Sequence, residues 1–82
     1  MKRSRHTIIS QVLNICIGGA SKTKIVYQAN LNFRTVNPYI ELLTKNGLIN
    51  IKNGSTVIYE TTEKGKALLD SIRQVQNELS KT

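Results

Sequence analysis

The chain has few cysteines, few acidic residues and no long apolar run, and each shortage excludes a class of protein. Cys16 is the only cysteine among 82 residues, so neither an internal disulfide nor a cysteine-based zinc cluster can form. It stands in an apolar stretch, which predicts a buried, reduced thiol and not a nucleophile. No apolar run approaches membrane-spanning length, and no signal peptide follows Met1. We therefore expect a soluble protein of the cytoplasm with no membrane partner.

The residues that catalysis requires do not occur in recognisable sets. The chain has one histidine, His6, and it has no metal-type partner nearby. We find no paired acid and base, no Ser-His-Asp set and no phosphate-binding glycine loop. Gly18-Gly19 alone is too weak a signal to indicate a nucleotide. The sequence therefore predicts no enzyme, no catalytic residue, no cofactor and no metal site, and it indicates no small-molecule ligand.

Charge of one sign is what the chain has in excess. There are 12 Lys and Arg against 5 Asp and Glu, a net charge of +7. Residues 1–60 carry eight basic and two acidic residues, a net +6, whereas residues 61–82 carry four basic and three acidic, a net +1. This asymmetry favours binding of a polyanion such as DNA by the first 60 residues.

Apolar periodicity predicts two helices in the first third of the chain. The first runs from Ser4 to Ile17 and ends at Gly18-Gly19. The second begins after Ser21, whose hydroxyl can accept hydrogen bonds from the first turn. Asn30 tolerates the left-handed backbone that a sharp turn between two helices requires. The side chains expected to face the core are Ile8, Ile9, Val12, Leu13, Cys16, Ile17, Ile25, Val26 and Ala29.

A third helix is predicted to begin near Asn32, a good N-cap, and to end at Gly47. Its apolar stripe consists of Val36, Ile40 and Leu43. Pro38 interrupts this run, where it removes a backbone hydrogen bond and crowds the preceding turn. Either the helix kinks there, or Asn37 caps a regular part that begins at Pro38. Because the stripe continues across Pro38, we expect one helix with an irregular first turn.

A β-hairpin is expected from Leu48 to Tyr59. Asn53-Gly54 predicts a two-residue type I′ turn, because both central residues of that turn need positive φ. Thr56 to Tyr59, which are β-branched or aromatic, form the predicted return strand. Polar side chains at the hairpin tip can contact phosphate or the minor groove, or they form a plain polar turn. They are Lys52, Asn53 and Ser55.

A last helix is predicted from Glu63 to Ser80, with Thr62 as N-cap. Its apolar residues recur at spacings of four, three and four, which is a narrow a/d seam. They are Leu68, Ile72, Val75 and Leu79. The first turns, around Ala67 and Leu68, can pack on the first helix. The later turns either fold back on it or pair with a second copy, and we expect the second arrangement because little of the same chain remains to cover them.

The face of the third helix opposite its stripe is polar and partly basic. Arg34 can make paired hydrogen bonds with guanine and Asn37 with adenine. Glu41 on the same face opposes phosphate unless its carboxylate accepts from cytosine. The basic start of the chain is either a frayed terminus or an arm that contacts phosphates. The predicted DNA-binding residues are Arg3, Arg5, Lys22, Lys24, Arg34, Thr35, Asn37, Lys45, Lys52, Asn53 and Ser55.

Three segments and their order resemble the small archaeal winged helix-turn-helix DNA-binding proteins. The segments are KTKIVYQANLNF, YIELLTKNGLI and YETTEKGKALL, with the Asn-Gly hairpin between the last two. The resemblance covers about Ser4 to Leu79. This family includes chromatin-type proteins that dimerise through a C-terminal helix forming an antiparallel coiled coil. The resemblance implies DNA binding by the third helix and the hairpin, and a homodimer through the last helix.

Together these features predict a mainly α fold with a β-hairpin wing, a winged helix-turn-helix. Residues 1–60 are expected to form the DNA-binding body and residues 61–82 a dimerisation helix, within one structural domain. The expected function is a dimeric binder of double-stranded DNA, either a transcription regulator or a nucleoid-associated protein. The alternative is a winged helix that binds another protein, because fold alone does not decide function.

Overall fold

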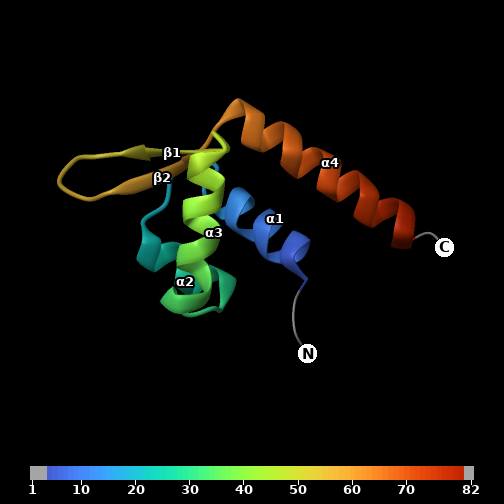
Figure 1. The fold of residues 1–82 in the computed structure, drawn as a ribbon, viewed down its shortest axis with the longest axis horizontal. Helices are drawn as coiled ribbons and strands as arrows, with labels where there is room; N and C mark the ends of the chain where they lie inside the picture. Colours follow the sequence, from blue (N-terminus) through green and yellow to red (C-terminus); the bar gives the residue numbers. More distant parts are fainter. Residues whose placement is uncertain (1–3, 81–82) are drawn as a thin grey trace.

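The predicted order of three helices, a hairpin and a fourth helix is confirmed by the computed structural model, which describes residues 4–80, the last two of them by backbone only (Figure 1). The elements are α1 (Arg5–Ile15), α2 (Lys22–Ala29), α3 (Phe33–Lys45), β1 (Ile49–Lys52), β2 (Ile58–Thr61) and α4 (Glu63–Ser80). The two strands pair antiparallel and, with the loop between them, form a projection that we call the wing.

Each helix begins at a side chain that accepts a hydrogen bond from a backbone N–H of the first turn. These caps are Ser4 for α1, Ser21 for α2, Asn32 for α3 and Thr62 for α4. α3 ends at Lys45, and Gly47, the residue after the C-cap Asn46, has a φ of +72°. There the Leu48 N–H donates to the Leu43 carbonyl at 2.9 Å, as in a Schellman motif. Asn30 has a φ of 56°, which confirms the left-handed turn between α2 and α3.

α3 continues without a break through Pro38. The alternative in which Asn37 caps a shorter helix is therefore wrong. The first turn also lacks the expected irregularity, since Asn32 Oδ1 accepts from the Thr35 N–H at 2.8 Å as an ordinary cap. A residue other than proline at position 38 would donate its N–H to the Arg34 carbonyl. Because Arg34 is exposed, solvent can donate to this carbonyl instead.

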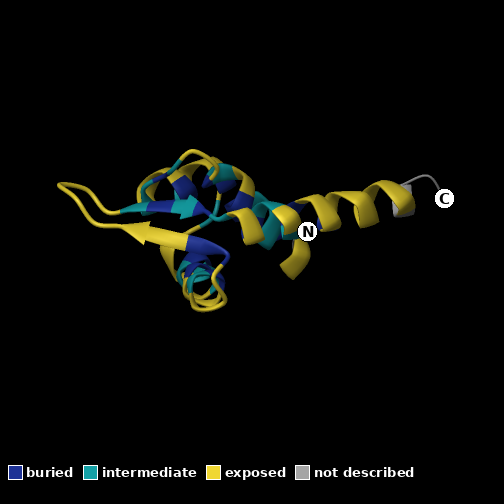
Figure 2. Cartoon of the chain, turned by 90° about the horizontal axis from the view of Figure 1, so that it is seen from above, coloured by how far each residue is buried: buried dark blue, intermediate teal, exposed yellow. Residues whose placement is uncertain are grey.

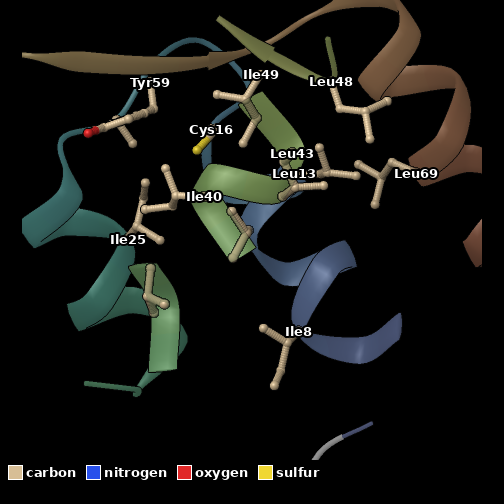
Figure 3. Packing of buried hydrophobic residues seen from close by; sticks show 13 residues of the cluster. Ile8, Leu13, Cys16, Ile25, Ile40, Leu43, Leu48, Ile49, Tyr59 and Leu69 are labelled. Atoms are coloured by element: carbon tan, nitrogen blue, oxygen red, sulfur yellow. The ribbon is translucent and has the colours of Figure 1, made fainter. Parts of the chain in front are cut away.

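The core lies where α1, α3 and the wing meet, with α2 packed on one side of it and the first half of α4 on the opposite side (Figure 3). The predicted stripes of α1, α2 and α3 supply most of it. Ile17 is an exception, because α1 ends at Ile15 and Ile17 lies exposed in the following turn. Tyr59 is also buried, and its backbone pairs with Ala20 through two hydrogen bonds of 2.9 and 2.8 Å.

The hairpin has a five-residue loop, residues 53–57, so the predicted type I′ turn at Asn53-Gly54 is wrong. Neither residue has a positive φ, and Thr56 and Val57 precede the return strand instead of belonging to it. In the observed register Ile51 pairs with Tyr59, and Thr61 Oγ1 donates to the buried Leu13 carbonyl at 2.6 Å. A two-residue turn would turn both Tyr59 and Thr61 to the solvent side of the hairpin.

α4 has the predicted bounds, but a different side chain anchors it. Leu69 is buried in the core, whereas Leu68 is half-buried and Ala67 is exposed. At Gly65 the backbone of α4 lies directly against Leu48, the residue before β1. A Cβ on Gly65 would collide with the carbonyl oxygen of Leu48. Residues 73–78 are exposed, and the C-terminal part of α4 extends away from the rest of the molecule (Figure 2).

Candidate nucleic-acid interface

The predicted recognition face of α3 is open to solvent. Arg34, Pro38, Glu41 and Lys45 are all exposed, while the opposite stripe is buried. Both facts follow from the helical repeat of 3.6 residues, which separates these positions from the stripe by about half a turn. The wing projects beside this face (Figure 1). α3 and the wing therefore present one continuous surface to a partner.

The other predicted DNA-binding residues lie on several parts of the molecule. Lys22, Asn37 and Lys45 line one hollow, and the tip residues of the wing, Asn53 and Ser55, are exposed. Lys24 on α2 is exposed, and Thr35 on α3 is half-buried. Arg5 is exposed at the start of α1, which lies away from the wing, and Arg3 falls outside the described residues (Figure 1).

The hollow lies between α3, the wing and the start of α2, and has a volume of about 400 Å³. We call it the α3–wing hollow. Its polar members include Asn37, Glu41 and Thr44, and its apolar wall is formed by Ile40, Ile51 and Tyr59. Lys22 also lines it, with Nζ 5.9 Å from the centroid of the Tyr59 ring, a cation–π distance. The wall was not predicted, because it depends on the hairpin register that brings Ile51 opposite Tyr59.

Two polar atoms in the α3–wing hollow are buried without a hydrogen-bond partner. They are Asn37 Oδ1 and Thr44 Oγ1. An unpaired buried acceptor costs about 1–3 kcal/mol, so such atoms are uncommon in native proteins. Both oxygens are shielded from solvent although their residues line the hollow, so the acceptor that a partner meets there directly is the exposed carboxylate of Glu41.

Lys52 is not a free cation on the wing. Its Nζ lies 2.8 Å from Glu60 Oε1 across the hairpin. The hydrogen bond and charge of Lys52 lower the pKa of Glu60 below its usual value of 4.5. The carboxylate is therefore ionised throughout the neutral range and offsets part of the charge that Lys52 presents to a phosphate.

We expect Glu60→Gln to tighten binding to duplex DNA by roughly two- to five-fold, the scale of one exposed charge pair. The change removes a negative charge and frees Lys52 for phosphate. Fluorescence anisotropy with a labelled duplex measures the effect. Glu63→Gln is the matched control, because Glu63 carries the same charge but pairs with Lys66 at the start of α4.

The pKa of Glu60 also sets how this gain depends on pH. Because its pKa lies below 4.5 in the folded protein, Glu60 stays ionised from pH 8 down to pH 5. The ratio between the variant and the unaltered protein should therefore be constant over that interval. A ratio that changed there, or an equal gain from Glu63→Gln, would show that the Lys52–Glu60 pair is not the cause.

Cys16 takes no part in this surface. Burial raises the pKa of its thiol to about 12, so the thiol is protonated at neutral pH and is a poor nucleophile. Among residues 4–80, no group of three or more His, Cys, Asp or Glu side chains is placed to hold a metal ion. Within the same part of the chain, no helix has the length and apolar character needed to cross a membrane.

This architecture matches that of a known protein family. The model of a family described as winged helix-turn-helix matches residues 2–80. The chain belongs to this winged helix-turn-helix family.

Two curated relatives are uncharacterized proteins of the archaeon Methanocaldococcus jannaschii. One is 40% identical over 75 residues, which is 90% of this chain and 74% of the relative. The other is 37% identical over 76 residues, 92% of this chain but only 35% of the relative.

Two solved structures resemble this chain. Sso10a-2, described as a DNA-binding protein from Sulfolobus solfataricus, superimposes with a TM-score of 0.90 and 31% identity over 96% of this chain and 84% of that one. BpsR of Bordetella bronchiseptica superimposes with a TM-score of 0.77 and 20% identity over 98% of this chain and 59% of that one. At that lower identity the likeness supports the fold alone.

Proposed function

We propose that this winged-helix protein binds double-stranded DNA as a homodimer, as a transcription regulator or a nucleoid-associated protein. α3 enters the major groove, and the wing and nearby lysines contact phosphates. The observation that carries the proposal is the exposed polar face of α3 beside the wing, on the part of the chain that holds a net +6. The similarity to Sso10a-2, itself a DNA-binding protein, supports it.

The dimer is proposed from the apolar side of α4. A groove of about 530 Å³ runs between the start of α1 and α4, and its apolar lining is Ile9, Leu68, Ile72 and Val75. Val75 is 59% exposed in the single chain. A second copy related by two-fold symmetry supplies the same stripe and covers this groove. The side chain of Leu79, the fourth predicted seam residue, lies outside the described part of the structure.

A second candidate function is binding of another protein, and one observation favours it. Tyr27 is 84% exposed and lines an apolar hollow with Phe33 at the corner between α2 and α3. This corner lies beside the recognition face and not on it. The net charge and the polar face of α3 therefore weigh toward DNA.

The proposal is tested by titrating a duplex at two salt concentrations. Affinity should fall steeply as salt rises, because each neutralised phosphate releases counterions. Arg34→Gln should weaken binding by about 1–3 kcal/mol and relax sequence preference, the cost of a lost base contact. Lys52→Ala, on the wing, should weaken binding evenly across sequences.

Arg73→Gln is the control for Arg34→Gln. It removes the same charge from α4, where the Arg73 guanidinium donates to Asn14 Oδ1 at 2.7 Å. Equal losses from the two variants would leave only general charge attraction. No duplex binding at low salt, or binding that ignores salt, would remove the DNA function and favour a protein partner.

A further inference from the structure

The α3–wing hollow combines hydrogen-bond acceptors with an apolar wall. The acceptor open to a partner is the Glu41 carboxylate, whereas Asn37 Oδ1 and Thr44 Oγ1 are unpaired but buried. Glu41 is exposed at the hollow and belongs to the recognition face of α3. The Glu41 carboxylate favours an entering group that brings an N–H donor.

The apolar wall beside these acceptors is accessible because of the hairpin register. Ile51 pairs with Tyr59, so its side chain is on the same side of the hairpin as the buried Ile49. It nevertheless lies beyond the edge of the core and remains 45% exposed. Ile40, on α3, continues the wall into the core. A small apolar group next to the donors would be covered by this wall.

The edges of the base pairs in the major groove differ in these two properties. Guanine presents two acceptors, N7 and O6, which a carboxylate repels. Adenine presents an N6 amine, and its partner thymine presents a C5 methyl group. An A·T pair alone offers both an amine donor and a methyl group, whereas G·C offers the cytosine amine with no methyl.

We propose that the α3–wing hollow reads an A·T base pair in the major groove, an inference that rests on the proposed DNA binding. The thymine methyl packs against Ile51, and the one N–H of the adenine amine that base pairing leaves free is donated to the Glu41 carboxylate. Lys22 and Lys45, which also line the hollow, balance the charge of Glu41 and face the flanking phosphates.

The test compares three duplexes of equal length: alternating A·T, the same duplex with every thymine replaced by uracil, and a mixed-order G·C duplex. The alternating sequence places an A·T pair at the hollow in every register. Uracil differs from thymine only in lacking the methyl group. We expect the uracil duplex to bind about four-fold more weakly, the value of one buried methyl-sized group, and the G·C duplex to bind more weakly still.

Ile51→Ser should abolish the difference between the thymine and uracil duplexes. Val57→Ser is the matched control, because Val57 is 42% exposed on the same hairpin but does not line the hollow. This variant should keep the difference. The comparison of the two duplexes with the unaltered protein needs no variant, so a folding defect in Ile51→Ser does not decide the outcome.

Salt-dependent binding that is equal for thymine and uracil duplexes overturns this inference and leaves DNA binding intact. A thymine preference that survives Ile51→Ser in a folded protein also overturns it, because the methyl is then read elsewhere. Absence of binding to all three duplexes at low salt overturns the proposed function together with the inference.

Discussion

Val75→Glu is expected to separate the proposed dimer into folded monomers and to weaken duplex binding by about 10²-fold or more, the typical gain from linking two binding modules. Val75 is 59% exposed in the single chain and lines the groove between α1 and α4. In a two-fold dimer the variant places two carboxylates in an apolar seam, where burial of unpaired charge is costly. Light scattering measures the mass, and anisotropy with a duplex measures the affinity.

Val75 tests the dimer better than Ile72 does. Ile72 is 9% exposed because its own chain already covers it, so a charge there would damage the monomer as well. Gln74→Glu is the matched control, since Gln74 is exposed on the same helix, does not line the groove and acquires the same charge. If the unaltered protein is monomeric at high micromolar concentration, or if both variants behave alike, α4 does not form the dimer.

Gly65→Ala is expected to lower the free energy of unfolding by about 1–3 kcal/mol, the usual cost of overpacking. In most helices this change stabilises by up to about 1 kcal/mol, because alanine has the better helix propensity. Here the added Cβ meets the carbonyl oxygen of Leu48 and lies 2.7 Å from Thr61 Cγ2. The start of α4 must then move away from β1, which weakens the hydrogen bond from the Thr62 N–H to Leu48, 3.0 Å long.

Thermal unfolding followed by circular dichroism measures the effect of Gly65→Ala, with an expected fall in melting temperature of roughly 5–20 °C. Gly54→Ala is the control. Its added Cβ lies 3.8 Å from the Thr56 carbonyl oxygen, an ordinary contact, and its φ is not in the left-handed region. That variant should change stability by less than about 0.5 kcal/mol. Equal stability of the two variants would mean that the approach of α4 to β1 is loose.

The apolar stripe of α4 was predicted from the sequence, but the way the helix docks on the core was not. The spacing of Leu68, Ile72 and Val75 correctly indicated an apolar stripe along the helix. It did not indicate that Leu69 is the side chain buried in the core, because periodicity gives the relative angles of side chains and not the direction in which the helix docks. That direction is decided by Gly65, where the backbone of α4 approaches the Leu48 carbonyl.

The candidate interface also has one part that the sequence predicted and one part that it did not. The exposed face of α3, with Arg34 and Lys45, could be predicted because the buried stripe of a helix determines its opposite face. The α3–wing hollow could not, because Ile51 reaches it only in the observed hairpin register. Asn53-Gly54 favours a two-residue turn by its local chemistry, and the burial of Tyr59 and Thr61 overrides that preference.

The sequence by itself determined the number, order and starts of the helices, since N-caps such as Ser21, Asn32 and Thr62 act within one turn of the chain. It also determined the excess of positive charge and its place in the first 60 residues. Only the tertiary structure decided the hairpin register, the docking of α4 and the walls of the α3–wing hollow. Each of these depends on contacts between segments far apart in the chain, such as Thr61 with Leu13 and Gly65 with Leu48, which no local pattern encodes.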